Sequence, residues 1–465
     1  MFTPCRGRFQ TCPYKTIVFM ERIFQKARSL QKQKDFIMTT NHIGPDAILQ
    51  KKQEYLIPCV YHFYRKPMQI VRGKMQHLYD HTGKQYLDFY GGVSVMNAGH
   101  CNPEVVEKIC EQVRTLQHTT AIYLTQPIVD LAEKLAQITP RSLKRSFFCA
   151  SGSEANEGAA LLAQLYTGKN KFVAIQQGLH GRTKLTMNLT GLPMWRTDPN
   201  PLSDVVHIPG AYCYRCAYGL TYPRCDLTCA WRLEDVVKNG EYAAFIAEPI
   251  QGNGGILTPP PGYFKLIREI LDRYHVLFIA DEVQTGFGRT GEMFAIEHWD
   301  VLPDIMTLAK ALANGTPIGA FITNDTIASS YTRPGASTTG GNPVSATAAL
   351  ATIDVIEKHQ LVERARTLGA YFQEKLLELQ QRHTIIGEVR GKGLMLGVEL
   401  VKEDKIPAAE ETDHILERLK DCGILAGKTG VSRNVLTFQP PLVITGTDID
   451  HVAKTLDSIL YSGCS

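Results

Sequence analysis

Seven short apolar runs alternate with amphipathic helical patterns along the middle of this chain, from about residue 102 to residue 343. The runs are RSFFCA, KFVAIQQ, DVVHIPG, AAFIAEPI, VLFIADEV, DIMTLAKA and GAFITND. Helical patterns lie between them, for example over Glu154–Tyr166 and Tyr263–Tyr274. Parallel strands are buried on both faces and joined by helical crossovers, so this alternation predicts an α/β domain with a mostly parallel sheet covered by helices.

The sequence changes character on both sides of this region. Before it, MQHLYDHTGKQYLDFYGG predicts a hairpin with its turn at DHTG. After it, we expect long helices over Val344–His359 and Leu361–His383, then strands in GEVRGKGLMLGVEL and NVLTFQPPLVI. These patterns predict a large domain at residues 101–343 and a smaller α+β domain at 344–465, which the segment 41–100 joins.

The composition argues against two kinds of partner. The net charge is only +4 and no long basic run occurs, so we expect no nucleic acid. No stretch approaches the ~18 uninterrupted apolar residues that a membrane span needs. With 44% hydrophobic residues, the chain is expected to be a soluble globular protein with a large core.

The first forty residues carry eight Lys and Arg against two acidic residues, Glu21 and Asp35. This bias fits a mitochondrial transit peptide, but the segment is poor in serine. A disordered or mis-assigned extension, with Met20 or Met38 as the true start, is the alternative. We therefore expect residues 1–40 to be a disordered or targeting extension. The expected location is the cytoplasm, with the mitochondrial matrix as the alternative.

The segment FFCASGSEANEGAALL runs from a strand through a turn of small residues into a helix. Ser151 and Glu154 have the spacing of a capping box, and Gly152 lets a ligand approach the backbone. Free amide groups at a helix N-terminus bind anions. The segment is a candidate phosphate site, and an ordinary capped helix is the alternative.

Asp281 ends the run VLFIADEV, at the edge where an α/β sheet binds its ligands. No Gly-x-Gly-x-x-Gly motif precedes it, which argues against a ribose-binding role in a dinucleotide fold. A buried carboxylate at this edge holds a neighbouring heteroaromatic nitrogen in its protonated form.

Lys310 follows another apolar run, in PDIMTLAKALANGTPIGA. Desolvation there lowers the pKa of an amine and makes it a nucleophile, whereas a lysine extending from a helix end to solvent is the alternative. A phosphate site, an acid for a ring nitrogen and an amine for an aldehyde match the three functional groups of pyridoxal 5′-phosphate (PLP).

Nine stretches between about Ile57 and the C-terminus carry a resemblance to a known family. They are YLDFYGGVSVMNAGHCNPEV, SGSEANEGA, LHGRT, IAEPIQG, IADEVQTGFGRTG, LAKALANGTPIGA, STTGGNPVSA, VRGKGLMLGVEL and QPPLVIT. Through them the chain resembles the class III (subgroup II) PLP-dependent aminotransferases of fold type I. Its segment PCVYHFYRKPMQIVRGKMQHLYD is most similar to the alanine–glyoxylate aminotransferase 2 branch.

The resemblance implies a role for each matching residue. Lys310 would be the catalytic Schiff-base lysine, and Asp281 would pair with the pyridine nitrogen. The other cofactor-binding residues would be Gly152 and Ser153 at the phosphate, Val283 on the ring, Gln284 at the ring hydroxyl, and Thr338 at the phosphate of a neighbouring subunit. The last role implies a homodimer with shared active sites, with a tetramer also possible. Glu248 would lie beside the substrate.

The chain departs from the family pattern at two positions. Leu179 stands where an aromatic residue usually stacks on the cofactor ring, which forfeits roughly 0.5–1.5 kcal/mol of stacking. Thr437 stands where close relatives carry the arginine that binds the substrate α-carboxylate. Arg390 is the expected substitute, with Arg433 and Lys428 as alternatives.

Four of the twelve cysteines lie close together in CYRCAYGLTYPRCDLTC. The C-x2-C and C-x3-C spacing of Cys213, Cys216, Cys225 and Cys229 allows a tetrahedral zinc site. The interpretation that we adopt is four reduced thiols in a packed insertion, without metal, because a large protein with no export signal keeps its thiols reduced.

These features together predict a PLP-dependent transaminase. It would move an amino group from alanine or an ω-amino acid, such as β-alanine or 4-aminobutyrate, to a 2-oxo acid such as glyoxylate or pyruvate. The alternative on the same fold is a racemase or an amino-alcohol-phosphate lyase, because PLP stabilises the same carbanion in each reaction.

Overall fold

The computed structural model describes residues 42–462, so the expected extension at residues 1–40 lies outside the described residues. Contacts divide the chain into two units, residues 1–61 and residues 62–465. In the first unit the structure describes one helix, α2 (Pro45–Tyr55). All elements below belong to the second unit. None of the described helices has both the length and the apolar content that crossing a membrane requires.

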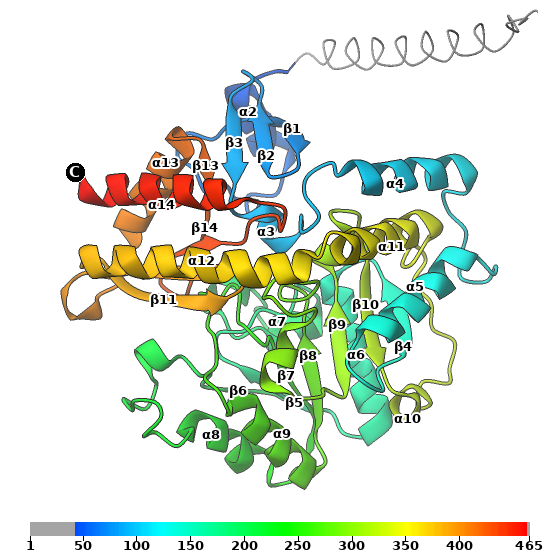
Figure 1. The fold of residues 1–465 in the computed structure, drawn as a ribbon. Helices are drawn as coiled ribbons and strands as arrows, with labels where there is room; N and C mark the ends of the chain where they lie inside the picture. Colours follow the sequence, from blue (N-terminus) through cyan, green and yellow to red (C-terminus); the bar gives the residue numbers. More distant parts are fainter. Residues whose placement is uncertain (1–41, 463–465) are drawn as a thin grey trace, which may run out of the picture. The chain divides into compact units, whose positions relative to one another are not determined.

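The large sheet has seven strands, and each of the seven apolar runs forms one of them (Figure 1). The strands are β4 (Arg145–Cys149), β5 (Lys171–Ile175), β6 (Val205–Ile208), β7 (Tyr242–Ala247), β8 (Leu277–Asp281), β9 (Ile305–Leu308) and β10 (Gly319–Thr323). Their order is β4-β10-β9-β8-β7-β5-β6. Neighbours are parallel except at β10, which runs antiparallel to both β4 and β9.

Helices cover this sheet as predicted. Helix α6 (Gly152–Thr167) packs against strands β7 to β10 and β4, while α8 (Thr228–Val237) and α9 (Tyr263–Tyr274) pack against each other and against β6 and β8. Helix α11 (Pro343–Lys358) packs on α4 (Pro103–Thr115) and α5 (Gln126–Ile138). The remaining short helices are α3 (Gly91–Ser94), α7 (Lys184–Leu189) and α10 (Asp325–Ala328).

Two four-stranded sheets form the smaller α+β part, and the first of them combines both ends of this unit. In the first, the predicted hairpin of β2 (His77–Asp80) and β3 (Gln85–Asp88) lies between β1 (Ile70–Lys74) and the C-terminal strand β13 (Ile424–Leu425). The second contains β11 (Ile386–Lys392), β12 (Met395–Leu400), β15 (Val435–Phe438) and β14 (Gly427–Thr429). Helices α12 (Leu361–Arg382), α13 (Ala409–Asp421) and α14 (Gly446–Tyr461) pack beside them.

These observations confirm the predicted fold class, a mostly parallel α/β sheet covered by helices with a smaller α+β part from both chain ends. The predicted long helices end within a residue or two of α11 and α12. The domain boundaries near residues 100 and 343 stay a prediction.

Arg289 joins the loop after β8 to the smaller α+β part. Its side chain is fully buried and donates to the carbonyls of Leu394 and Pro440 and to Asn97 Oδ1. Burial lowers the pKa of Arg289 to about 9, and the charge of Asp88 acts in the opposite direction. The two terminal nitrogens of this buried cation are thus satisfied by three distant segments, and this clamp of hydrogen bonds holds the segments beside β8.

Candidate active site

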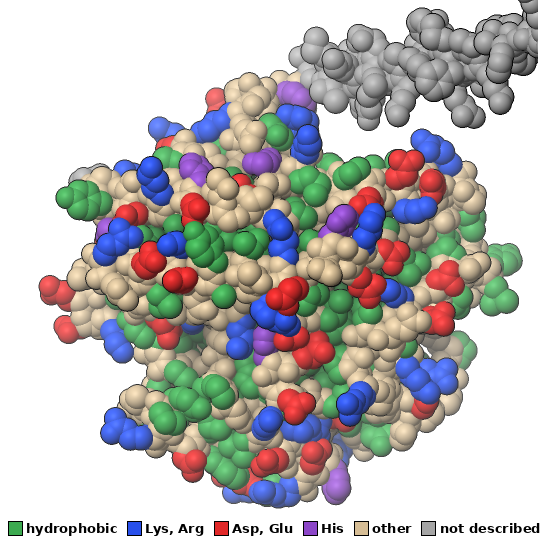
Figure 2. Space-filling view, in the orientation of Figure 1, with side chains coloured by type: hydrophobic (Ala, Val, Ile, Leu, Met, Phe, Trp, Pro, Cys, Tyr) green, Lys and Arg blue, Asp and Glu red, His purple; other side chains and the backbone are tan. Residues whose placement is uncertain are grey.

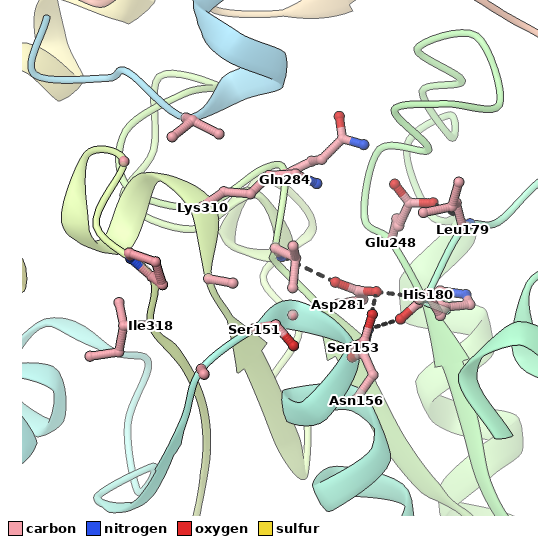
Figure 3. Close-up of a pocket in the computed structure, with 18 of the residues that line it drawn as sticks. Ser151, Ser153, Asn156, Leu179, His180, Glu248, Asp281, Gln284, Lys310 and Ile318 are labelled. Atoms are coloured by element: carbon pink, nitrogen blue, oxygen red, sulfur yellow. Dashed lines mark hydrogen bonds and ion pairs between the residues drawn. The ribbon is translucent and has the colours of Figure 1, made fainter. Parts of the chain in front are cut away.

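A cavity of about 360 Å³ lies beyond the ends of β4, β7, β8 and β9 (Figure 3). Seven of the predicted site residues line it: Gly152, Ser153, Glu248, Asp281, Val283, Gln284 and Lys310. Leu179, the departure at the ring-stacking position, lines it as well. The carboxyl ends of parallel strands meet at one edge of a sheet, which is why residues more than 150 positions apart share this cavity.

The N-terminus of α6 forms one wall. Ser151 is the N-cap, and its Oγ accepts a hydrogen bond from the Glu154 amide at 3.2 Å. The Glu154 carboxylate accepts from the Ala150 amide at 2.6 Å, one residue before the cap, so the predicted capping box closes around a longer turn. A Cβ at Gly152 would lie 2.9 Å from Val283 Cγ1, so only glycine fits there without displacement. The free amides of this first turn can receive an anion.

Asp281 is buried at the end of β8 and held by fixed donors. Its Oδ2 accepts from His180 Nδ1 at 2.7 Å and from Asn156 Nδ2 at 2.8 Å. Asn156 is oriented in turn by Thr307, whose hydroxyl donates to Asn156 Oδ1 at 2.6 Å. These bonds fix the carboxylate so that it can pair with a cation in the cavity.

His180 and Asn156 were not among the predicted site residues. Both line the cavity, and Figure 3 shows them converging on Asp281. The signal that could have found them is their place inside the motifs LHGRT and SGSEANEGA, which already carry the resemblance to the family. His180 Nε2 is buried and has no partner among the described residues.

Lys310 opens a short 3-10 helix, Lys310–Ala313, directly after β9. Its φ of 45° is in the left-handed region, which is unusual for a residue with a side chain. Desolvation lowers the pKa of its amine, and the charges of Asp281 and Glu248 partly oppose that shift. A larger fraction of the amine is therefore uncharged and nucleophilic at neutral pH.

Glu248 lies across the cavity at the end of β7. One carboxylate oxygen accepts from the Leu179 amide at 2.9 Å and the other from the Gly252 amide at 3.0 Å. Burial and the nearby Asp281 charge raise the pKa of Glu248 to about 7. Two backbone amides are thus the hydrogen-bond partners of this carboxylate.

The structure does not bring Arg390 or Thr338 into this cavity. Arg390 is buried in β11, where its Nε donates to the Gly255 carbonyl at 2.8 Å and Nη1 to Glu399 at 2.6 Å. Glu388 is its other ion-pair partner. Thr338 is exposed on the segment between α10 and α11.

The other C-terminal candidates are also engaged elsewhere. Thr437 is buried in β15, with its hydroxyl 2.6 Å from that of Thr429. Lys428 pairs with Asp413, and the Arg433 guanidinium lies over the Phe63 ring. This cavity therefore receives no arginine side chain from the described residues.

The cysteine-rich segment lies between β6 and α8. Cys213 opens a short 3-10 helix, Cys213–Arg215, and Cys229 lies in α8. The nine cysteines that the structure describes are all free thiols. Within residues 42–462, no group of three or more His, Cys, Asp or Glu is arranged to hold a metal ion. The zinc alternative stays a prediction.

Comparison with known proteins agrees with this geometry. The family model of class-III aminotransferases matches residues 62–460. An alanine–glyoxylate aminotransferase 2 homologue from Arabidopsis thaliana, described as mitochondrial, is 45% identical over 90% of this chain and 88% of its own. A leucine/methionine racemase from Thermococcus litoralis is 40% identical over 84% of this chain and 90% of its own.

Two solved structures share the fold. A PLP-bound amine transaminase from an uncultivated Pseudomonas species has a TM-score of 0.83, with 30% identity over 89% of this chain and 99% of its own. A phospholyase from Arthrobacter, in complex with phosphoethanolamine, has a TM-score of 0.82, with 30% identity over 90% and 100%.

The chain belongs to the class-III aminotransferase family, and its cofactor is PLP. The residues that line the cavity fit this cofactor. The cavity combines a capped helix N-terminus without side-chain obstruction, a buried carboxylate with fixed donors, and an amine whose pKa is lowered. These groups match the phosphate, the ring nitrogen and the aldehyde of PLP.

Proposed function

We propose that this enzyme moves an amino group from alanine or an ω-amino acid, such as β-alanine or 4-aminobutyrate, to a 2-oxo acid such as glyoxylate or pyruvate. The observation that carries the proposal is the placement of the Lys310 amine in one cavity with Asp281 and the α6 N-terminus. The alanine–glyoxylate aminotransferase 2 homologue among its relatives supports the donor and acceptor class.

The proposal assigns a role to each residue at the cofactor. Gly152 and Ser153 bind the phosphate through the first turn of α6, and Asp281 keeps the ring nitrogen protonated. Val283 packs on the ring, and Gln284 hydrogen-bonds its hydroxyl. PLP, when bound, supplies an electron sink for the bond that breaks at the substrate carbon. The Lys310 amine would hold the aldehyde carbon and, once the substrate amine has displaced it, would accept and return the proton that moves during transfer.

We also propose a homodimer with shared active sites, in which Thr338 reaches the phosphate bound by the partner. Exposed apolar side chains gather on the connection between α4 and α5 (Figure 2). Ile122, Tyr123 and Leu124 are 84%, 68% and 101% exposed. Such a patch is typical of a protein interface, and a second copy of this chain is the expected occupant. Sedimentation of the purified protein tests this; a monomer would contradict it.

The location in the cell stays a prediction, with the cytoplasm expected and the mitochondrial matrix as the alternative. The relative described as mitochondrial supports the mitochondrial alternative. The segment at residues 1–40, which would decide between the two locations, lies outside the described residues.

The proposed function is tested by titrating the PLP-loaded enzyme with L-alanine, β-alanine and 4-aminobutyrate in separate experiments, without an acceptor. The visible band of the bound cofactor should bleach with at least one donor and return on adding glyoxylate or pyruvate. The Lys310→Ala variant should show no turnover. A fully active Lys310→Ala variant would refute the role of Lys310, and a wild-type band that no donor bleaches would refute the substrates.

A racemase or an amino-alcohol-phosphate lyase is the second candidate. It is supported by the racemase relative and the phospholyase structure, and by Thr437 at the position where an arginine usually binds the substrate carboxylate. Both alternative reactions proceed without a 2-oxo acid. Loss of optical activity from a single amino acid, or release of phosphate from phosphoethanolamine, in acceptor-free buffer would favour this candidate.

A further inference from the structure

The side chain of Gln284 is held from several directions at the cavity wall. Gln439 Nε2 donates to its Oε1 at 3.2 Å, and Ser94 Oγ donates to its backbone carbonyl at 2.7 Å. Gly252 packs against the same carboxamide so closely that a Cβ there would lie 2.2 Å from Oε1. The Gln284 amide therefore has little freedom to rotate.

Gln439 is itself fixed. Gln439 is buried just after β15, and its backbone amide donates to the Phe89 carbonyl at 2.8 Å. The backbone carbonyl oxygen of Gln439 packs against Gly91 so closely that a Cβ on Gly91 would lie 2.5 Å from it. The next residue, Pro440, accepts the hydrogen bond from Arg289. The backbone on both sides of the Gln439 side chain is therefore fixed, and the side chain is buried, which keeps its Nε2 donor next to Gln284.

An amide has a donor end and an acceptor end, so occupying one determines what the other presents. We propose that Gln439 is a positioning residue: by donating to Gln284 Oε1, it turns Gln284 Nε2 toward the cavity as a donor to the PLP ring oxygen. This rests on the proposed contact between Gln284 and that oxygen. An ionised ring oxygen accepts from an N–H but repels a carbonyl, so amide orientation decides whether Gln284 attracts or repels the cofactor.

Two substitutions separate positioning from packing. Gln439→Met keeps the length and removes both polar ends, so Gln284 loses its orientation. Gln439→Glu, when ionised, can only accept, so it reverses Gln284 and points the carbonyl at the ring oxygen. Thr437→Val is the matched control, because Thr437 is buried two residues earlier and its hydroxyl pairs only within the smaller sheets.

The measurement is the dissociation constant of each apoprotein for PLP and for an analogue that lacks the ring hydroxyl, with thermal unfolding of each apoprotein as a folding check. The ratio of the two constants isolates the contact with the ring oxygen. We expect the wild type and Thr437→Val to bind PLP about tenfold more tightly than the analogue, as a hydrogen bond to a charged group predicts. Gln439→Met should discriminate less than about threefold, and Gln439→Glu not at all or in reverse.

The outcomes are distinguishable. If the wild type discriminates and Gln439→Met discriminates equally, Gln439 does not orient Gln284 and the proposal is wrong. If the wild type binds both compounds equally, the contact between Gln284 and the ring oxygen is wrong, whatever the transaminase activity shows. If Gln439→Glu does not fold, the ratio for Gln439→Met still decides.

Discussion

Replacing Gly152 with alanine tests the fit between the helix N-terminus and the cofactor. The added Cβ would lie 2.9 Å from Val283 Cγ1, 3.2 Å from its Cγ2 and 3.5 Å from Ala309 Cβ. Carbon atoms pack at about 3.5–4.0 Å, so Val283 must move by roughly 0.6 Å or more. Because Val283 lines the cavity, that movement takes space from the cofactor ring.

The magnitude follows from the cost of overpacking. Inserting a methyl group into a packed site costs about 1–3 kcal/mol. In the apoprotein Val283 can move into the cavity, so the cost falls on cofactor binding. It then corresponds to an affinity for PLP that is about 5- to 150-fold weaker. Absorbance titration of the apoprotein with PLP measures it directly.

Gly446 provides a matched control within the same chain. Like Gly152, it is the first residue of a helix that follows a capping residue, here Thr445. A Cβ on Gly446 would meet nothing within 4 Å. Gly446→Ala should leave PLP affinity unchanged and alter stability by at most about 1 kcal/mol, favourably if at all. Equal PLP affinity for Gly152→Ala and the wild type, or equal losses in both variants, would refute this account of the α6 N-terminus.

Three further outcomes are expected. Asp281→Asn, which keeps the shape but removes the charge that His180 and the ring nitrogen face, should lower kcat/KM by at least about 100-fold; a loss under tenfold would contradict the ion pair. Burial raises the pKa of Glu282 to about 7 from its ordinary value of 4.5. The destabilising effect of this carboxylate is therefore absent below pH 4.5, grows between pH 4.5 and 7, and is complete above pH 7. Glu282→Gln should therefore remove up to about 3 kcal/mol of the stability that the apoprotein loses between pH 5 and 8, measured by urea unfolding; an unchanged pH dependence would contradict it. Arg289→Lys, which cannot reach all three acceptors, should destabilise the apoprotein by about 2–4 kcal/mol in the same assay, and a loss below 0.5 kcal/mol would show that the clamp is dispensable.

Strands and long helices could be predicted because their signals are local. An apolar run such as VLFIADEV is buried on both faces whatever its neighbours are, and it forms β8. The strand order and the antiparallel direction of β10 depend on contacts between distant segments, so no local pattern determines them.

The residues of the candidate site also fall into those that could be predicted from the sequence and those that could not. Lys310, Asp281 and Gly152 could be placed because each lies at the end of a strand or shortly after it, and parallel strands end at one edge. The partners of Asp281 and the bond from Gln439 to Gln284 could not, because they join residues more than 100 positions apart. The charge of Arg390 makes it a candidate for binding a carboxylate, and no local pattern predicts that Glu399 binds it instead.

The backbone conformation at Lys310 lowers the stability of the folded protein at the residue that its reaction requires. A side chain in left-handed backbone costs about 1 kcal/mol, and a desolvated amine adds to it. Glycine at this position would remove both the backbone strain and the desolvated amine, and would give a more stable but inactive apoprotein. Screening for heat resistance alone would therefore select against the residue on which turnover depends, and engineering of this chain must select for both properties together.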